Sequence, residues 1–145
     1  MRRTSSNRPL TPVHESEDLR LESAPRVQRL WELIEKRAWH EAGALLREDA
    51  VIYWPHTGEL IKGRANYIEV NRNYPEGWQI QIVSVIGHAN RASIEVRVPH
   101  ERFGVSVVAG FYELAGGMIV QGTEYWVDEK SQAAPNWRAG WTERR

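Results

Sequence analysis

Cysteine is absent from the 145-residue sequence. Its absence excludes a disulfide-stabilised scaffold, a cysteine nucleophile, a cysteine-ligated zinc site and an iron–sulfur cluster. Charge of one sign is not in excess either, because 19 basic residues face 19 acidic ones. A nucleic-acid-binding protein normally carries a basic excess or stripe, so we expect no nucleic-acid partner.

Long apolar runs are missing as well. No window approaches the roughly 18 consecutive apolar residues of a membrane span, so we expect no membrane partner. Arg2 and Arg3 are not followed by the apolar stretch of a signal peptide, which predicts a cytoplasmic location. Nucleotide-binding glycine loops and the G-x-S-x-G elbow are also missing. The five histidines show no metal-binding spacing, so neither a metal nor another cofactor is expected.

The length suits one domain. Residues 1–24 are rich in serine, proline and charge and show no apolar period, so they form a polar N-terminal arm. This arm is either flexible or packed against the body or a partner. The remaining residues, 25–145, form the single domain.

The apolar periodicity predicts three helices and six strands. The first helix starts at Pro25 after a candidate cap at Ser23, and an apolar stripe follows it to Ala38. Further helices are expected at 40–48 and 64–73, and strands at 50–54, 59–61, 78–86, 92–98, 103–114 and 118–128. Helices followed by strands indicate an α+β fold, with helices covering one face of an antiparallel sheet and a pocket between them.

Two segments carry a family resemblance: REDAVIYWPHTGELIKGRANYI at 47–68 and GGMIVQGTEYWVD at 116–128. With the opening helix, they resemble the NTF2-like superfamily, and within it the SnoaL-like group of polyketide cyclases. The resemblance implies a cystatin-like cone, with a curved antiparallel sheet wrapped around three N-terminal helices. It also implies an apolar cavity for a small hydrophobic molecule and a homodimer formed through a sheet face.

The sequence departs from the resembling enzymes at one position and matches them loosely at another. In the ketosteroid isomerases of the superfamily, a general-base aspartate directly precedes the proline that ends the first strand. Trp54 precedes Pro55 here, and an indole cannot take a proton. In the polyketide cyclases, a catalytic aspartate lies near the end of the last strand, which makes Asp128 a candidate.

Glu124 is the first candidate for chemistry, because glutamate is disfavoured in the middle of a strand. It shares a strand face with Trp126. If that face lines the cavity, apolar surroundings raise the carboxyl pKa and suit it to acid–base catalysis. Otherwise Glu124 faces solvent or holds a structural contact. A single bulge within residues 118–128 would reverse every later side chain, so the assignment depends on register.

Glu95 and Arg97 form the second candidate. They lie on the polar side of an alternating strand, so they either face solvent or a dimer partner, or line the cavity. In the cavity, Arg97 would hold a substrate oxygen and Glu95 would act as a base. A third set is aromatic and forms either the core or a cavity for a ring-bearing ligand, with His56 at its mouth: Tyr53, Trp54, Trp78, Phe111 and Trp126.

Three functions remain open at this stage. The first is a cyclase, isomerase or hydrolase that uses Glu124 as acid or base, with Glu95 and Arg97 in support and Tyr53 as an oxyanion donor. The second is a non-catalytic module that binds a hydrophobic ligand. The third is an interaction module that dimerises through the sheet and uses the N-terminal arm to hold a partner.

Overall fold

The computed structural model describes residues 23–145, so the predicted arm lies outside the described residues except for its last two. Helix α2 (Ala24–Glu35) follows the predicted stripe and buries Val27, Leu30, Trp31 and Ile34. Ser23 occupies the N-cap position, but its hydroxyl makes no capping bond. The predicted serine cap is therefore wrong in its chemistry, although the helix begins where expected.

The remaining elements follow the predicted order. Helices α3 (Trp39–Gly43) and α4 (Arg64–Arg72) are joined by strands β1 (Leu46–Trp54) and β2 (Glu59–Lys62). The helix expected at 40–48 is shorter than predicted, because Leu46 already pairs in the sheet. Strands β3 (Gln81–His88), β4 (Arg91–His100), β5 (Gly104–Ala115) and β6 (Met118–Asp128) follow. Trp78 lies outside β3 and forms only an isolated bridge with His100.

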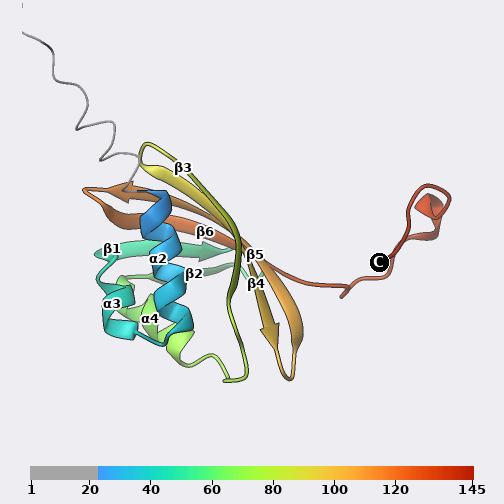
Figure 1. Ribbon diagram of the computed structural model, residues 1–145, viewed down its shortest axis with the longest axis horizontal. Coiled ribbons are helices and arrows are strands. Elements are labelled where there is room, and N and C mark those ends of the chain that lie inside the picture. The colour runs from blue at the N-terminus through green and yellow to red at the C-terminus, as the bar shows by residue number, and fades with distance from the viewer. Residues whose placement is uncertain (1–22) are drawn as a thin grey trace, which may run out of the picture.

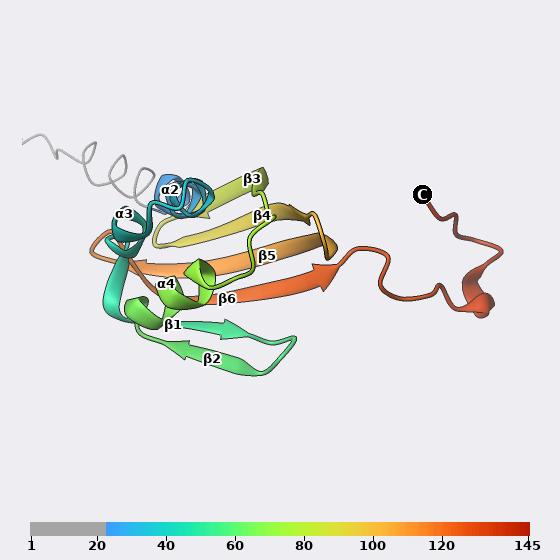
Figure 2. The same cartoon turned by 90° about the horizontal axis from the view of Figure 1, so that it is seen from below.

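The sheet has the strand order β2-β1-β6-β5-β4-β3. Every neighbouring pair is antiparallel except β1 and β6, which run parallel. The three helices cover one face of this curved sheet (Figures 1 and 2). The predicted α+β cone is thus confirmed, with one parallel pair where the N-terminal hairpin joins the last strand.

Alternation along β4 separates the two faces of the sheet. Ala92, Ile94, Val96 and Val98 are buried and point toward the helices. We call the helix-covered side the inner face and the opposite side, which no helix of residues 23–145 covers, the outer face. Because side chains alternate along a strand, the polar residues between those four belong to the outer face.

Strand β6 contains a bulge that decides which side chains point inward. Gln121 pairs with Glu113 and Ile119 pairs with Leu114, so Val120 is the extra residue. Ile119 and Gly122 are both buried although they are three residues apart. An unbroken alternation from Ile119 would have placed Glu124 on the outer face, so the bulge places it inside.

The chain beyond β6 runs away from the body of the molecule (Figures 1 and 2). Its one regular element is a 3₁₀ turn, η1 (Asn136–Arg138). We call residues 130–145 the C-terminal tail. Among the helices of the described residues, none is long and apolar enough to cross a membrane.

Candidate functional site

A cavity of about 310 Å³ lies between the inner face and the helices. Its wall is mainly aromatic, and Trp126 packs against both Trp31 and Trp54, with ring centroids 6.4 and 6.0 Å apart. Four aliphatic side chains complete the apolar wall: Ile34, Val70, Ile80 and Val98. A volume and lining of this kind suit a small ring-bearing molecule.

Glu124 lies behind this wall, fully buried with 1% of its surface exposed. Its Oε1 accepts a hydrogen bond of 2.8 Å from the Trp54 indole N–H. Its Oε2 accepts hydrogen bonds from the hydroxyls of Tyr67 at 2.7 Å and Tyr112 at 2.6 Å. The Tyr112 oxygen in turn accepts a bond of 3.1 Å from the Trp31 indole. The network therefore joins α2, β1, α4, β5 and β6 through one carboxyl group.

Two glycines make room for the Tyr112 ring. A Cβ atom at Gly110 would lie 2.7 Å from the Tyr112 hydroxyl, and one at Gly122 would lie 2.7 Å from the same ring. Gly110 and Gly122 are on the strand pair that carries Tyr112 and Glu124. Because neither glycine has a side chain, the ring can lie flat across the inner face and reach the carboxyl group.

Burial raises the pKa of the Glu124 carboxyl, and the bonds from Tyr112, Trp54 and Tyr67 oppose this rise. The Trp126 indole also lowers this pKa, yet its N–H makes no hydrogen bond of normal geometry. Burial also raises the pKa values of Tyr67 and Tyr112 well above the ordinary tyrosine value, with the neighbouring carboxyl adding to the effect. Both tyrosines therefore remain neutral donors at ordinary pH.

Glu124 does not itself line the cavity, whereas Trp54, which it binds, does. Its contacts fix the orientation of Trp54 directly and of Trp31 through Tyr112. A carboxyl group that is enclosed in this way shapes the wall of the cavity. The sequence prediction that Glu124 faces inward among apolar neighbours agrees with this geometry.

The rim of the cavity is polar. Asp128 lies there at the end of β6, and its Oδ1 accepts a bond of 2.8 Å from the Ser106 hydroxyl. Tyr74 stands nearby, and burial, followed by the charge of Asp128, raises the pKa of its hydroxyl. His56 and Asn71 complete the polar rim. Asp128 is thus the carboxylate that lines the cavity among the described residues.

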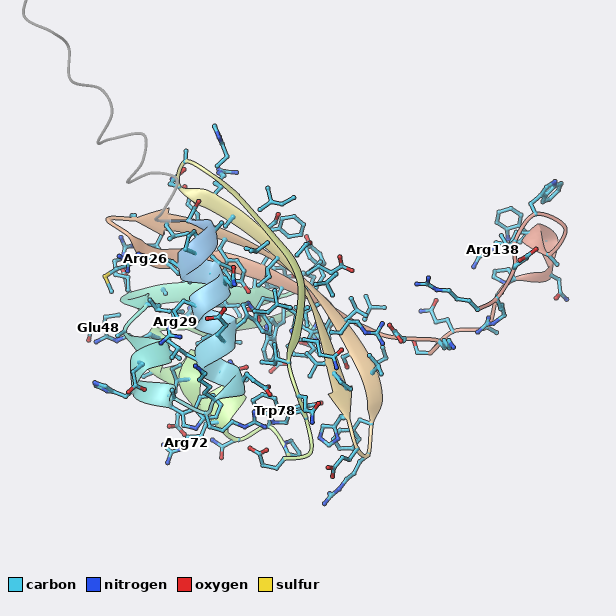
Figure 3. All side chains as sticks on the ribbon, viewed as in Figure 1. Arg26, Arg29, Glu48, Arg72, Trp78 and Arg138 are labelled. Atoms are coloured by element: carbon cyan, nitrogen blue, oxygen red, sulfur yellow. The ribbon has the colours of Figure 1, made fainter. Side chains whose placement is uncertain are left out.

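Two indole N–H groups of the cavity wall have no hydrogen-bond partner among residues 23–145. They belong to Trp78 and Trp126, and both are buried. The Arg37 guanidinium, two residues beyond α2, stacks 3.2 Å from the centroid of the Trp78 ring. Figure 3 labels Trp78 close to the end of that helix. Both N–H atoms are enclosed by protein, and the Trp126 indole interacts with the Glu124 carboxyl.

The other predicted site residues lie on the outer face. Glu95 and Arg97 alternate with the buried residues of β4, and Arg97 forms an ion pair with Glu129. Tyr53 and Phe111 are also on this side, each about half exposed. The expectation that these four residues line the cavity is wrong, because strand alternation turns them away from the helices. Trp54, His56, Trp126 and Asp128 do line it.

Sequence reasoning missed the tyrosines that bind Glu124. Tyr67, Tyr74 and Tyr112 carry no local sequence pattern that points to chemistry. The one available signal for Tyr112 was its position between Gly110 and Gly122 on paired strands, which requires knowing the register. No group of three histidine or acidic side chains that could hold a metal occurs in the part of the chain that is described.

The α+β cone is the fold of the NTF2-like class. Residues 27–122 match the model of the SnoaL-like domain, and the chain belongs to this family. Among curated proteins, none matches the chain.

Solved structures show the same fold. The "putative ketosteroid isomerase" of Kribbella flavida DSM 17836 is 27% identical, with a TM-score of 0.78 over 90% of this chain and 92% of its own. An NTF-2 like protein of unknown function from Burkholderia xenovorans LB400 is 20% identical, with a TM-score of 0.69 over 83% and 93%. An LEH-like epoxide hydrolase of M. tuberculosis is 17% identical, with a TM-score of 0.62 over 73% and 83%.

Proposed function

We propose that the protein binds a small, ring-bearing, largely apolar molecule in the cavity between the helices and the sheet. The observation that carries the proposal is the aromatic wall around about 310 Å³ of space. The polar side chains of Asn71 and Tyr74, which also line the cavity, favour a ligand that carries an oxygen acceptor, such as a carbonyl or hydroxyl group. Glu124 supports binding by fixing the positions of the indoles that form the wall.

Native mass spectrometry of the purified protein tests binding without a chosen ligand. We expect a mass above that of the bare chain, and a small molecule that is released when the same sample is denatured. The released molecule should contain a ring and at least one oxygen. A released molecule that is acyclic, or a bare chain after incubation with the neutral ring-bearing dye 1-N-phenylnaphthylamine, would contradict the proposal.

Acid–base catalysis is the second candidate function, and Asp128 favours it. This carboxylate lines the cavity, whereas the position of the isomerase base is occupied by Trp54. With a β,γ-unsaturated cyclic ketone, Asp128 would take the proton between the carbonyl and the alkene and return it to the γ carbon. The neutral Tyr74 hydroxyl would donate to the oxygen that gains charge. The "putative ketosteroid isomerase" neighbour supports trying this reaction first.

Replacing Asp128 tests the catalytic role. The substitution Asp128→Asn should lower the rate of ketone conjugation, followed by ultraviolet absorbance, by about a hundredfold or more, because general-base catalysis contributes at least that much. Asp49→Asn is the matched control, since Asp49 is exposed on β1 and paired with Arg47. Equal rates in Asp128→Asn and the parent protein, or no turnover by the parent, would count against catalysis while leaving ligand binding standing.

We also propose that the outer face pairs with a second copy of the chain. Its apolar side chains include Tyr53, Phe111, Tyr125 and Val127, which are 41–60% exposed. The rings of Phe111 and Tyr125 already pack edge to face, with centroids 6.0 Å apart. A contiguous apolar surface of this kind on a folded domain is typical of an interface.

A further inference from the structure

The C-terminal tail exposes two tryptophans without covering either. Trp137 is 74% exposed and Trp141 is 83% exposed, and every residue from Lys130 to Arg145 is exposed. Backbone hydrogen bonds in the tail are local, from Arg138 N–H to Pro135 and from Trp141 N–H to Arg138. Figure 3 shows the labelled Arg138 well clear of the body.

The composition of this turn is that of a contact surface. Trp and Arg are enriched at the energetic centres of protein interfaces, and large aromatic side chains gain most from leaving water. The turn η1 places Trp137 and Trp141 four residues apart, with the Arg138 guanidinium 5.9 Å from the Trp137 ring centroid. The tail therefore presents two exposed tryptophans and a cation stacked near one of them.

The tail begins at the margin of the outer face. Glu129, the residue before it, donates its backbone N–H to Val105 O at 2.9 Å and forms an ion pair with Arg97 of the outer face. From there the chain continues past the end of β6 and away from its own sheet (Figure 2). The tail thus starts beside the surface that we propose for pairing and carries η1 beyond it, and its last residues, Arg144 and Arg145, line a hollow with Arg97 and Glu129.

The outer face offers a groove lined by apolar, acidic and basic side chains. The groove has a volume of about 420 Å³, and Ile86, Phe111 and Thr123 are among the side chains that line it. Glu113 lies in this groove directly across from Arg91 of β4, which also lines it, and Glu95 lies further along β4. Neither glutamate is in an ion pair within residues 23–145. The tail contains four basic residues and a single acidic one: Lys130, Arg138, Arg144 and Arg145 against Glu143.

We infer that the tail of one protomer docks on the outer face of a second copy of this chain, with Trp137 and Trp141 in the groove beside Phe111. The exchange is reciprocal, because a two-fold axis places each tail on the partner's sheet and closes the assembly at two copies. This inference rests on the proposed dimer and adds the segment that holds it together.

The lack of native cysteine permits a direct cross-linking test in the full chain. Two single-cysteine variants are made: Ala139→Cys, between the two tail tryptophans and carrying an affinity tag, and Thr123→Cys, on the outer face. The proteins are mixed, allowed to exchange subunits and oxidised. We expect a mixed disulfide between the tagged and untagged chains. Its yield should be at least ten times the yield from the control mixture of Ala139→Cys with Ala65→Cys. Ala65 is exposed on α4, on the opposite side of the molecule.

Light scattering of the same proteins separates the two proposals. A dimer that gives no mixed disulfide above the Ala65→Cys control would overturn tail exchange and leave the outer-face dimer intact. A monomer at all concentrations would overturn both. If instead the double variant Ala139→Cys/Thr123→Cys closes a disulfide within one chain while the single-variant mixture stays uncross-linked, the tail folds onto its own sheet and the inference is wrong.

Discussion

Replacing Glu124 with leucine should lower the free energy of unfolding by about 3 kcal/mol, more than a hundredfold in the folding equilibrium. Three donors converge on this carboxyl group, from Trp54, Tyr67 and Tyr112. A leucine accepts none of them, and each buried donor that loses its acceptor costs about 1–3 kcal/mol, partly offset by the removal of a buried carboxyl group. Urea denaturation followed by tryptophan fluorescence measures the change.

Glu48→Leu provides the matched control, because Glu48 is exposed on β1. It should change stability by no more than about 0.5 kcal/mol. If Glu124→Leu does not fold, Tyr112→Phe keeps the prediction testable, since it removes one donor to Glu124 and the acceptor of Trp31. A loss below about 0.5 kcal/mol in either variant would show that the network does not stabilise the fold.

The raised pKa of Glu124 sets the direction in which folding stability changes with pH. The folded pKa of Glu124 is raised above 4.5, so folded protein keeps a proton that the unfolded chain has lost. The stability that Glu124 contributes through its raised pKa is fully present below pH 4.5 and is lost as the pH rises through the folded pKa. The stability of the parent protein relative to Glu124→Gln should therefore fall as the pH rises above 4.5. A relative stability that rises over this range would show that the ionised carboxylate is favoured instead.

Filling the cavity should weaken ligand binding by about tenfold or more, the equivalent of at least 1.4 kcal/mol. Val70 lines the cavity from α4 and is 38% exposed, so Val70→Trp adds an indole to the cavity mouth with little strain in the core. The affinity is measured with 1-N-phenylnaphthylamine, a neutral fluorescent dye that avoids repulsion by the Asp128 carboxylate at the rim.

Val83→Trp makes the same substitution on β3, at a valine that is 51% exposed and away from the cavity. Dye affinity in this variant should match that of the parent protein. The dye could also adsorb to the apolar outer face, and Phe111→Ser reports such adsorption. If Val70→Trp binds as tightly as the parent while Phe111→Ser binds weakly, the dye occupies the outer face and the cavity proposal loses its support.

Most of the fold could be predicted from the sequence, because the apolar stripes of helices and the alternation of strands are local signals. The stripe of α2 and the alternation of β4 appear in the structure as predicted. The end of α3 was misjudged because Leu46 fits an amphipathic helix as well as a strand. Only pairing with β6 distinguishes the two, and that partner lies more than 70 residues away.

The site was harder to predict because it depends on register. The outward direction of Tyr53, Glu95, Arg97 and Phe111 follows from which strand face the helices cover, and alternation alone is symmetric between the two faces. Glu124 points inward because of the bulge at Val120, and the residue types around Val120 do not determine where the bulge occurs. Asp128 reached the rim by the same shift of register.

The parallel pairing of β1 with β6 also sets an order of events for a growing chain. The hairpin of β1 and β2 touches the rest of the sheet only through β6, the final strand to leave the ribosome. Until residues 118–128 arrive, the hairpin has no strand to join, and Trp54 and Tyr67 have no acceptor. Closing so long a loop is entropically costly and slow. Strand β6 therefore joins the two parts of the sheet. A chain that stops short of β6 leaves the facing edges of β1 and β5 unpaired and open to aggregation.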